Sequence, residues 1–157
     1  ALEARDVLAV LQGAPGAPLD LRDRAVRLAA EILELANKAV AGAGITLARA
    51  ILDDGRAWRK FQAICEAQGG MRVPPRAAHT EVVAATRAGT VKLIDNRRLA
   101  RIAKLAGAPT SPAAGLELHS PVGTTVERNQ PLFTVHSEAP GELAYALAYV
   151  AANPAIF

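Results

Sequence analysis

Three histidines, His79, His119 and His136, are the side chains best suited to acid–base catalysis or metal binding in this sequence. Catalytic and zinc sites commonly place such residues at short spacings, for example H-x-x-x-H or C-x-x-C. None of the three has a partner at these spacings, and His119 and His136 fall near the ends of expected strands. We interpret them as strand-end or surface histidines, and we expect no catalytic residue, no cofactor and no metal site.

Two other groups have side chains that can do chemistry. Asp53 and Asp54 are adjacent, and neighbours on a helix point about 100° apart, so we expect them to end a helix before Gly55 rather than share a proton. Cys65 is the single cysteine and lies among aliphatic and aromatic residues, so we expect a buried small hydrophobe. The glycine-rich segments 11–18 and 40–46 match neither phosphate-loop pattern.

Four cations gather on one expected helix: Arg97, Arg98, Arg101 and Lys104. They supply much of the net charge of +3 and could contact phosphate or RNA. Since no aromatic residues stand among them to stack on bases, we favour the solvated face of an amphipathic helix. The alternative is a free-standing nucleic-acid or phosphate-binding module that uses helix 97–104.

The segment 122–143, VGTTVERNQPLFTVHSEAPGEL, has the pattern of domains that carry biotin or a lipoyl group on a lysine. In those carriers the lysine sits in the turn between two strands. Here no lysine follows Lys104, so the acceptor nucleophile is missing. We expect the segment to share the β-hammerhead fold of those domains but not their carrier chemistry.

The first half of the chain predicts helices. Asp20 is a good N-cap for a long helix to about Val40, and further helices are expected over 46–54 and 56–68. Trp58 and Phe61 should line the same side of the last helix as the cysteine. On the long helix, apolar residues recur at steps of three and four, which predicts an inward face of Leu21, Ala25, Leu28, Ile32, Leu35 and Ala39.

Composition changes at the prolines Pro74 and Pro75, where we place a domain boundary. Beyond it, strands are expected over 80–89, 90–96, 115–120 and 130–137. Helices are expected over 96–107, closed by Gly107, and 139–152, with Leu143, Ala146, Leu147 and Val150 facing inward. The pattern predicts an α+β fold.

Hydrophobic residues make up 51% of the chain, enough for a core. No run approaches the roughly 18 apolar residues of a membrane span, and these residues contain no basic-then-apolar segment of the secretory type. We therefore expect a cytoplasmic location and no membrane partner. The chain begins at Ala1 inside a helical pattern, and its only methionine is Met71. We expect a fragment of a larger protein.

An ordered series of segments runs along the chain: ALE at 1–3, DDGRA at 53–57, QGG at 68–70, IDNRRLARIAKLAGAP at 94–109, AAGLEL at 113–118 and QPLFTVHSE at 130–138. Taken together they resemble the C-terminal portion of the thymidine and pyrimidine nucleoside phosphorylase family. The likeness is greatest to its longer branch, which includes AMP phosphorylases. Asn129 stands where the family commonly has glycine, and asparagine tolerates that left-handed turn.

The resemblance implies a pentosyltransferase, which moves the sugar of a pyrimidine nucleoside or AMP to inorganic phosphate. Residues 1–72 would be the helical C-terminal part of the catalytic domain, and residues 78–157 the α/β-hammerhead C-terminal domain. The family's phosphate-binding, base-binding and proton-donating groups precede the matched region, so no catalytic residue is carried over. Asn37 stands near the glutamate of a monovalent-cation site known in some members, which puts that site in doubt.

The resemblance further implies what the chain would do and bind. It would have a structural role, be inactive alone, pack against the remainder of the catalytic domain and take part in a homo-oligomer. Phosphate and nucleoside or nucleotide would bind the full-length protein. The choice among thymidine, uridine and AMP, and the number of subunits, stay open.

Overall fold

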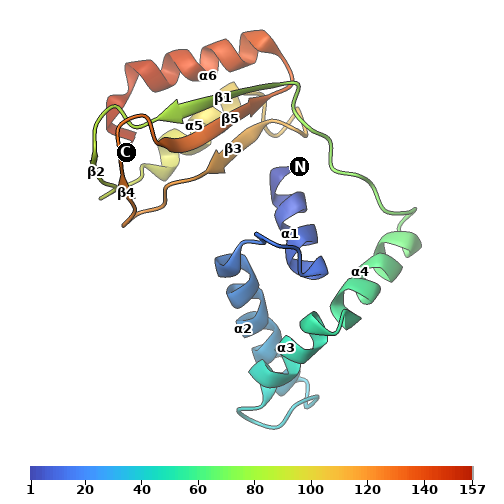
Figure 1. The fold of residues 1–157 in the computed structure, drawn as a ribbon. Coiled ribbons are helices and arrows are strands. Elements are labelled where there is room, and N and C mark those ends of the chain that lie inside the picture. The colour runs from blue at the N-terminus through green and yellow to red at the C-terminus, as the bar shows by residue number, and fades with distance from the viewer. Residues whose placement is uncertain (157) are drawn as a thin grey trace. The chain divides into compact units, whose positions relative to one another are not determined.

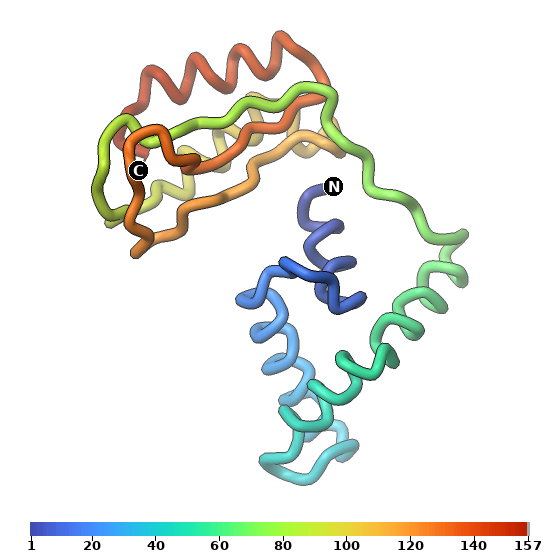
Figure 2. The backbone as a smooth tube through the Cα atoms, in the orientation of Figure 1, coloured from blue at the N-terminus to red at the C-terminus, as the bar shows by residue number. Residues whose placement is uncertain are grey.

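The computed structural model describes residues 1–156. The chain divides into two compact units, one of residues 3–73 and one of residues 74–156 together with residues 1–2 (Figures 1 and 2). The change of unit falls at Val73 and Pro74, beside the two prolines, where residues 70–77 form no helix or strand. In the described part of the chain, no helix is long and apolar enough to cross a membrane.

The first unit is helical. It holds α1 (Leu2–Gln12), α2 (Leu19–Leu35), α3 (Gly44–Asp53) and α4 (Arg56–Ala67). The expected N-cap role of Asp20 is wrong, because α2 begins one residue earlier and Pro18 holds the N-cap position without a side-chain bond. The helix also ends before Val40. Asn37 adopts a left-handed φ of 54°, and Lys38 N–H donates to the Leu33 carbonyl, which closes the last turn.

Helices α2 and α3 pack closely against each other, and a small cluster of Val26, Ala30 and Ala48 forms their shared core. Gly44 begins α3 beside α2, where its N–H donates to Glu34 Oε1 at 2.8 Å. A Cβ at Gly44 would lie 2.5 Å from the Ala30 carbonyl oxygen, so only glycine permits this approach.

The predicted inward face of α2 is therefore wrong in its main part. Leu28, Ile32 and Leu35 are 58%, 65% and 82% exposed, while the buried residues of the helix are Val26 and Ala30. The helix has two apolar stripes. Helix α3 covers only the stripe that contains Val26 and Ala30. We give the name outer α2 stripe to the half-buried Leu21 and the exposed Ala25, Leu28, Ile32 and Leu35.

The second unit combines helices with small antiparallel sheets, so the predicted α+β class is confirmed. Strand β5 (Pro131–Ser137) lies between β1 (His79–Ala84) and β3 (Gly115–Leu118). A separate two-stranded sheet pairs β2 (Gly89–Thr90) with β4 (Thr125–Val126). The strand expected over 90–96 is wrong beyond Thr90, because Lys92–Asp95 form no strand and Leu93 is 70% exposed.

Two helices cover one face of the three-stranded sheet, α5 (Asn96–Leu105) and α6 (Pro140–Ala152), as Figure 1 shows. The core between them holds Phe133 and Val135 of β5, Ile102 and Ala106 from the α5 side, and Ala146 of α6. A short 3-10 helix, Pro154–Ile156, adds Ile156 to this cluster. The inward residues predicted for α6 are confirmed, since Leu143, Leu147 and Val150 pack against the same core.

The ends of α5 follow from local chemistry. Asp95 caps its start, because its carboxylate accepts from the backbone N–H groups of Arg97 and Arg98 at 3.0 and 3.1 Å. Gly107 ends it with a φ of 114°, as predicted. The buried Ser137 hydroxyl donates to the Ala106 carbonyl at 2.8 Å and thereby ties β5 to the end of the helix.

Candidate functional site

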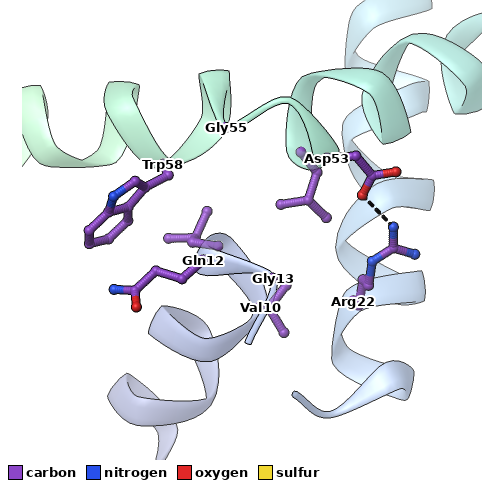
Figure 3. A pocket seen from close by; sticks show the side chains of 9 residues that line it. Val10, Gln12, Gly13, Arg22, Asp53, Gly55 and Trp58 are labelled. Atoms are coloured by element: carbon purple, nitrogen blue, oxygen red, sulfur yellow. Dashed lines mark hydrogen bonds and ion pairs between the residues drawn. The ribbon is translucent and has the colours of Figure 1, made fainter. Parts of the chain in front are cut away.

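A polar pocket of about 470 Å³ lies within the helical unit, where the end of α1, the start of α2 and the α3–α4 turn meet (Figure 3). In the figure, Arg22 and Asp53 point toward one another on one side, while Trp58 and Gln12 lie on the other. The volume falls in the range of small-molecule sites, roughly 300–1,000 Å³. The pocket is lined by Val10, Leu11, Gln12, Gly13, Arg22, Leu52, Asp53, Gly55 and Trp58.

The charge in this pocket is already paired. Arg22 Nη2 lies 2.6 Å from Asp53 Oδ1, and the two side chains are 28% and 59% exposed. The Asp53 carboxylate offsets the charge of Arg22, so this pair offers phosphate no net positive charge. The lining holds no histidine, cysteine, serine or lysine, and its one group able to act as a base or nucleophile near neutral pH, the Asp53 carboxylate, is engaged by Arg22. The pocket fits a structural junction better than a reaction site.

The turn beside the pocket is held by Asp54. Its Oδ1 accepts from the backbone N–H of Arg56 at 3.0 Å, and the Arg56 guanidinium contacts both carboxylate oxygens. These hydrogen bonds lower the pKa of Asp54 and raise that of Arg56. Gly55 supplies the left-handed φ of 77° that the turn needs. The predicted helix end at this pair of aspartates is confirmed, and each carboxylate contacts its own arginine.

A second, apolar cavity of about 430 Å³ lies among the four helices and opens along the outer α2 stripe. Its walls are aliphatic, and several are alanines, which leave room for large side chains from outside. The sequence predicted an inward face that includes Leu21, Ala25 and Ile32, and it did not predict an open groove there. We call this cavity the apolar groove; its lining is Val7, Val10, Leu11, Leu21, Ala25, Val26, Ala29, Ile32, Leu33, Ala48, Ile51, Leu52 and Ala57.

The histidines lie on or beside strands, and the structure pairs two of them with groups that the sequence did not reveal. His119 Nε2 lies 2.7 Å from Thr134 Oγ1, and His136 Nε2 lies 3.3 Å from Glu117 Oε2. His79 begins β1. Across residues 1–156, no three histidine, cysteine or acidic side chains gather where they could hold a metal ion.

Of the remaining candidates, Trp58 lines the polar pocket and the others line neither cavity. Cys65 is half-buried rather than fully buried, and the rings of Trp58 and Phe61 stack with centroids 6.0 Å apart. On α5, Arg98 pairs with Asp95 at 3.4 Å. The other three cations of that helix, Arg97, Arg101 and Lys104, are exposed.

The turn of segment 122–143 that carries Asn129 is compact. It joins β4 to β5 and spans Glu127–Gln130, where Glu127 N–H donates to the Gln130 side chain. Asn129 adopts the predicted left-handed conformation, with a φ of 70°. Its N–H donates to the Ala85 carbonyl at 2.8 Å, which ties the turn to the residue after β1.

Comparison with known proteins adds an independent finding. Residues 90–156 match the family model of the pyrimidine nucleoside phosphorylase C-terminal domain. Over 157 residues the chain is 63% identical to "Putative thymidine phosphorylase 2" of Acidovorax sp. (strain JS42), covering 100% of this chain and 31% of that protein. It is 62% identical over 153 residues to "Putative thymidine phosphorylase" of Polaromonas sp. (strain JS666 / ATCC BAA-500), covering 98% and 30%.

A third relative, "Putative thymidine phosphorylase" of Legionella pneumophila (strain Paris), is 61% identical over 145 residues, covering 92% of this chain and 28% of that protein. The chain therefore spans about 30% of the length of the curated relatives that it matches.

Proposed function

This chain carries the C-terminal domain of the pyrimidine nucleoside phosphorylase family, and we propose that it is the structural C-terminal part of a nucleoside or nucleotide phosphorylase. The whole enzyme would transfer a pentosyl group from a pyrimidine nucleoside or AMP to inorganic phosphate and release the free base. Residues 1–72 would complete its catalytic domain, and residues 78–157 would form its C-terminal domain. Alone, the chain would be inactive.

The observation that carries this proposal is the combination of high identity with partial coverage. The chain is 63% identical along its full length to a protein of which it covers only 31%. A phosphorylase needs cations or donors to hold phosphate and a proton donor for the departing base. The charged side chains of the polar pocket are one arginine and one aspartate, which pair with each other. This supports a role in packing and assembly rather than in the chemical step.

The same proposal covers the substrate, the location and the oligomeric state of the full-length enzyme. Thymidine, uridine and AMP remain alternatives, because the resemblance places the contacts that would distinguish them in the preceding part of such an enzyme. The full-length protein would be a cytoplasmic homo-oligomer that binds phosphate together with one of these substrates. We expect the chain itself to bind no cofactor or metal.

A second candidate function rests on α5. Its cations Arg97, Arg101 and Lys104 lie on one side of the helix and are exposed, so the chain could bind nucleic acid or phosphate groups as a separate module. Such binding would weaken steeply as salt rises, because phosphate contacts release counterions. Binding of an RNA or DNA oligonucleotide at low salt, lost on substitution of these residues, would favour this function; no binding at low salt would exclude it.

The proposed structural role is tested by an activity assay on the chain alone. Purified chain is incubated with inorganic phosphate and thymidine, uridine or AMP, and free base is quantified by chromatography. We expect no phosphate-dependent release of base. The matched control is the Acidovorax relative prepared in the same way. Turnover by the chain comparable with that of the relative would refute the proposal.

A further inference from the structure

The apolar groove and the outer α2 stripe form one continuous apolar surface on the helical unit. Leu21, Ala25 and Ile32 belong to both, and the stripe continues to Leu35 at the end of α2. Ile32 and Leu35 are 65% and 82% exposed. Large contiguous apolar surfaces of this kind are uncommon on isolated soluble proteins and usually mark a contact with another segment.

The residues of the outer α2 stripe lie on one side of α2 and are not scattered around the helix. Leu21, Ala25, Leu28, Ile32 and Leu35 follow one another at steps of three and four, which places them on one side of the helix. The buried Val26 and Ala30 form a separate stripe that contacts α3. A helix with two apolar stripes is suited to a position between two layers, and only one of those layers is present in this chain.

We propose that this surface is the docking face for the rest of a phosphorylase chain, the part that the longer relatives possess and this chain lacks. The inference rests on the proposed function, because it takes its occupant from that family. About 70% of the length of the Acidovorax relative lies outside the match, since the match covers 31% of it. The occupant presents bulky apolar side chains, for which the small walls Ala25, Ala29 and Ala57 leave space.

Full-length protein is needed to test this, and a chimera supplies it. The 157-residue chain replaces the matched segment of the Acidovorax relative, and Ile32→Asp is introduced both in the chimera and in the isolated chain. In the isolated chain Ile32 faces solvent, so we expect its melting temperature to change little. In the chimera the same carboxylate would be buried in an apolar contact, so we expect the melting temperature to fall by about 5 °C or more.

Two further variants serve as a control and as a milder substitution. Leu93→Asp is the matched control, because Leu93 is 70% exposed and belongs to the other unit. Its effect should be small and equal in both proteins. Ile32→Ala removes contacts without adding a charge, so it remains measurable if the aspartate variant of the chimera does not fold. It should destabilise the chimera more than the isolated chain.

The outcomes separate this inference from the proposed function. Equal effects of Ile32→Asp in both proteins would overturn the docking face, whether or not the chimera is active. A chimera that folds but releases no base, beside an active relative, would instead count against the proposed function. If the isolated chain forms a dimer that Ile32→Asp converts to a monomer, the face pairs with a second copy, and the inference is wrong.

Discussion

Replacing Gly44 by alanine tests the packing on which the docking face is built. The added Cβ would lie 2.5 Å from the Ala30 carbonyl oxygen and 2.6 Å from Glu34 Oε1. The glutamate can move, but the Ala30 oxygen belongs to the backbone of α2, so the two helices must separate. Such overpacking costs about 1–3 kcal/mol, and losing the Gly44–Glu34 hydrogen bond adds about 1 kcal/mol.

Alanine also favours a helix over glycine by up to about 1 kcal/mol. The net expectation for Gly44→Ala is therefore a loss of about 1–3 kcal/mol in the free energy of unfolding of the helical unit. Urea denaturation followed by the fluorescence of Trp58, the only tryptophan, reports on this unit selectively.

Gly141→Ala is the matched control, because Gly141 also lies in the first turn of a helix and an added Cβ there would contact nothing within 4 Å. It should leave the Trp58 unfolding curve unchanged, and unfolding of its own unit, followed by tyrosine fluorescence, should show equal or slightly higher stability. If Gly44→Ala were as stable as the wild type, the close approach of α2 and α3 would not be required, and the reasoning about this interface would be refuted.

Three other substitutions test the second unit and the turn. Gly107→Ala should destabilise the second unit by about 2–4 kcal/mol in tyrosine-detected unfolding, because the residue has a φ of 114° and its Cβ would lie 2.6 Å from Glu142 Oε2; an unchanged midpoint would contradict this. Ser137→Ala should cost about 1–3 kcal/mol by leaving the Ala106 carbonyl without its hydroxyl donor, whereas equal calorimetric stability would show that another donor replaces it. Asp54→Asn should lower stability at neutral pH, and the difference should shrink below about pH 4. The folded pKa of Asp54 lies below its ordinary 3.8, so its stabilisation is present above that value and is lost as the pH falls through the folded pKa; a difference independent of pH would argue against the ion pair.

The sequence predicted the structure correctly where a residue type determines its own backbone conformation. Gly107 ends α5 and Asn129 takes the left-handed turn conformation, both as predicted, because these residue types tolerate positive φ. The strand 131–137 and the helix 140–152 were also predicted, since each carries a single clear apolar pattern.

The failures share a different cause, which is dependence on distant parts of the chain. Periodicity identified apolar residues on α2 but could not tell which of two stripes α3 would cover, because that depends on Gly44 and Glu34, ten residues apart. The pairing of His136 with Glu117 likewise joins two strands and has no local signal. For the same reason the groove could not be predicted: it exists only once the four helices are assembled.

The central claim is that these residues supply structure to an enzyme and do not themselves hold its substrates. Calorimetric titration of phosphate, and then of thymidine, uridine and AMP in the presence of phosphate, tests it most directly on the isolated chain. We predict no saturable binding of any of them, because the charged residues of the polar pocket are already paired with each other. Saturable binding of phosphate or nucleoside, abolished by Arg22→Ala, would contradict the account.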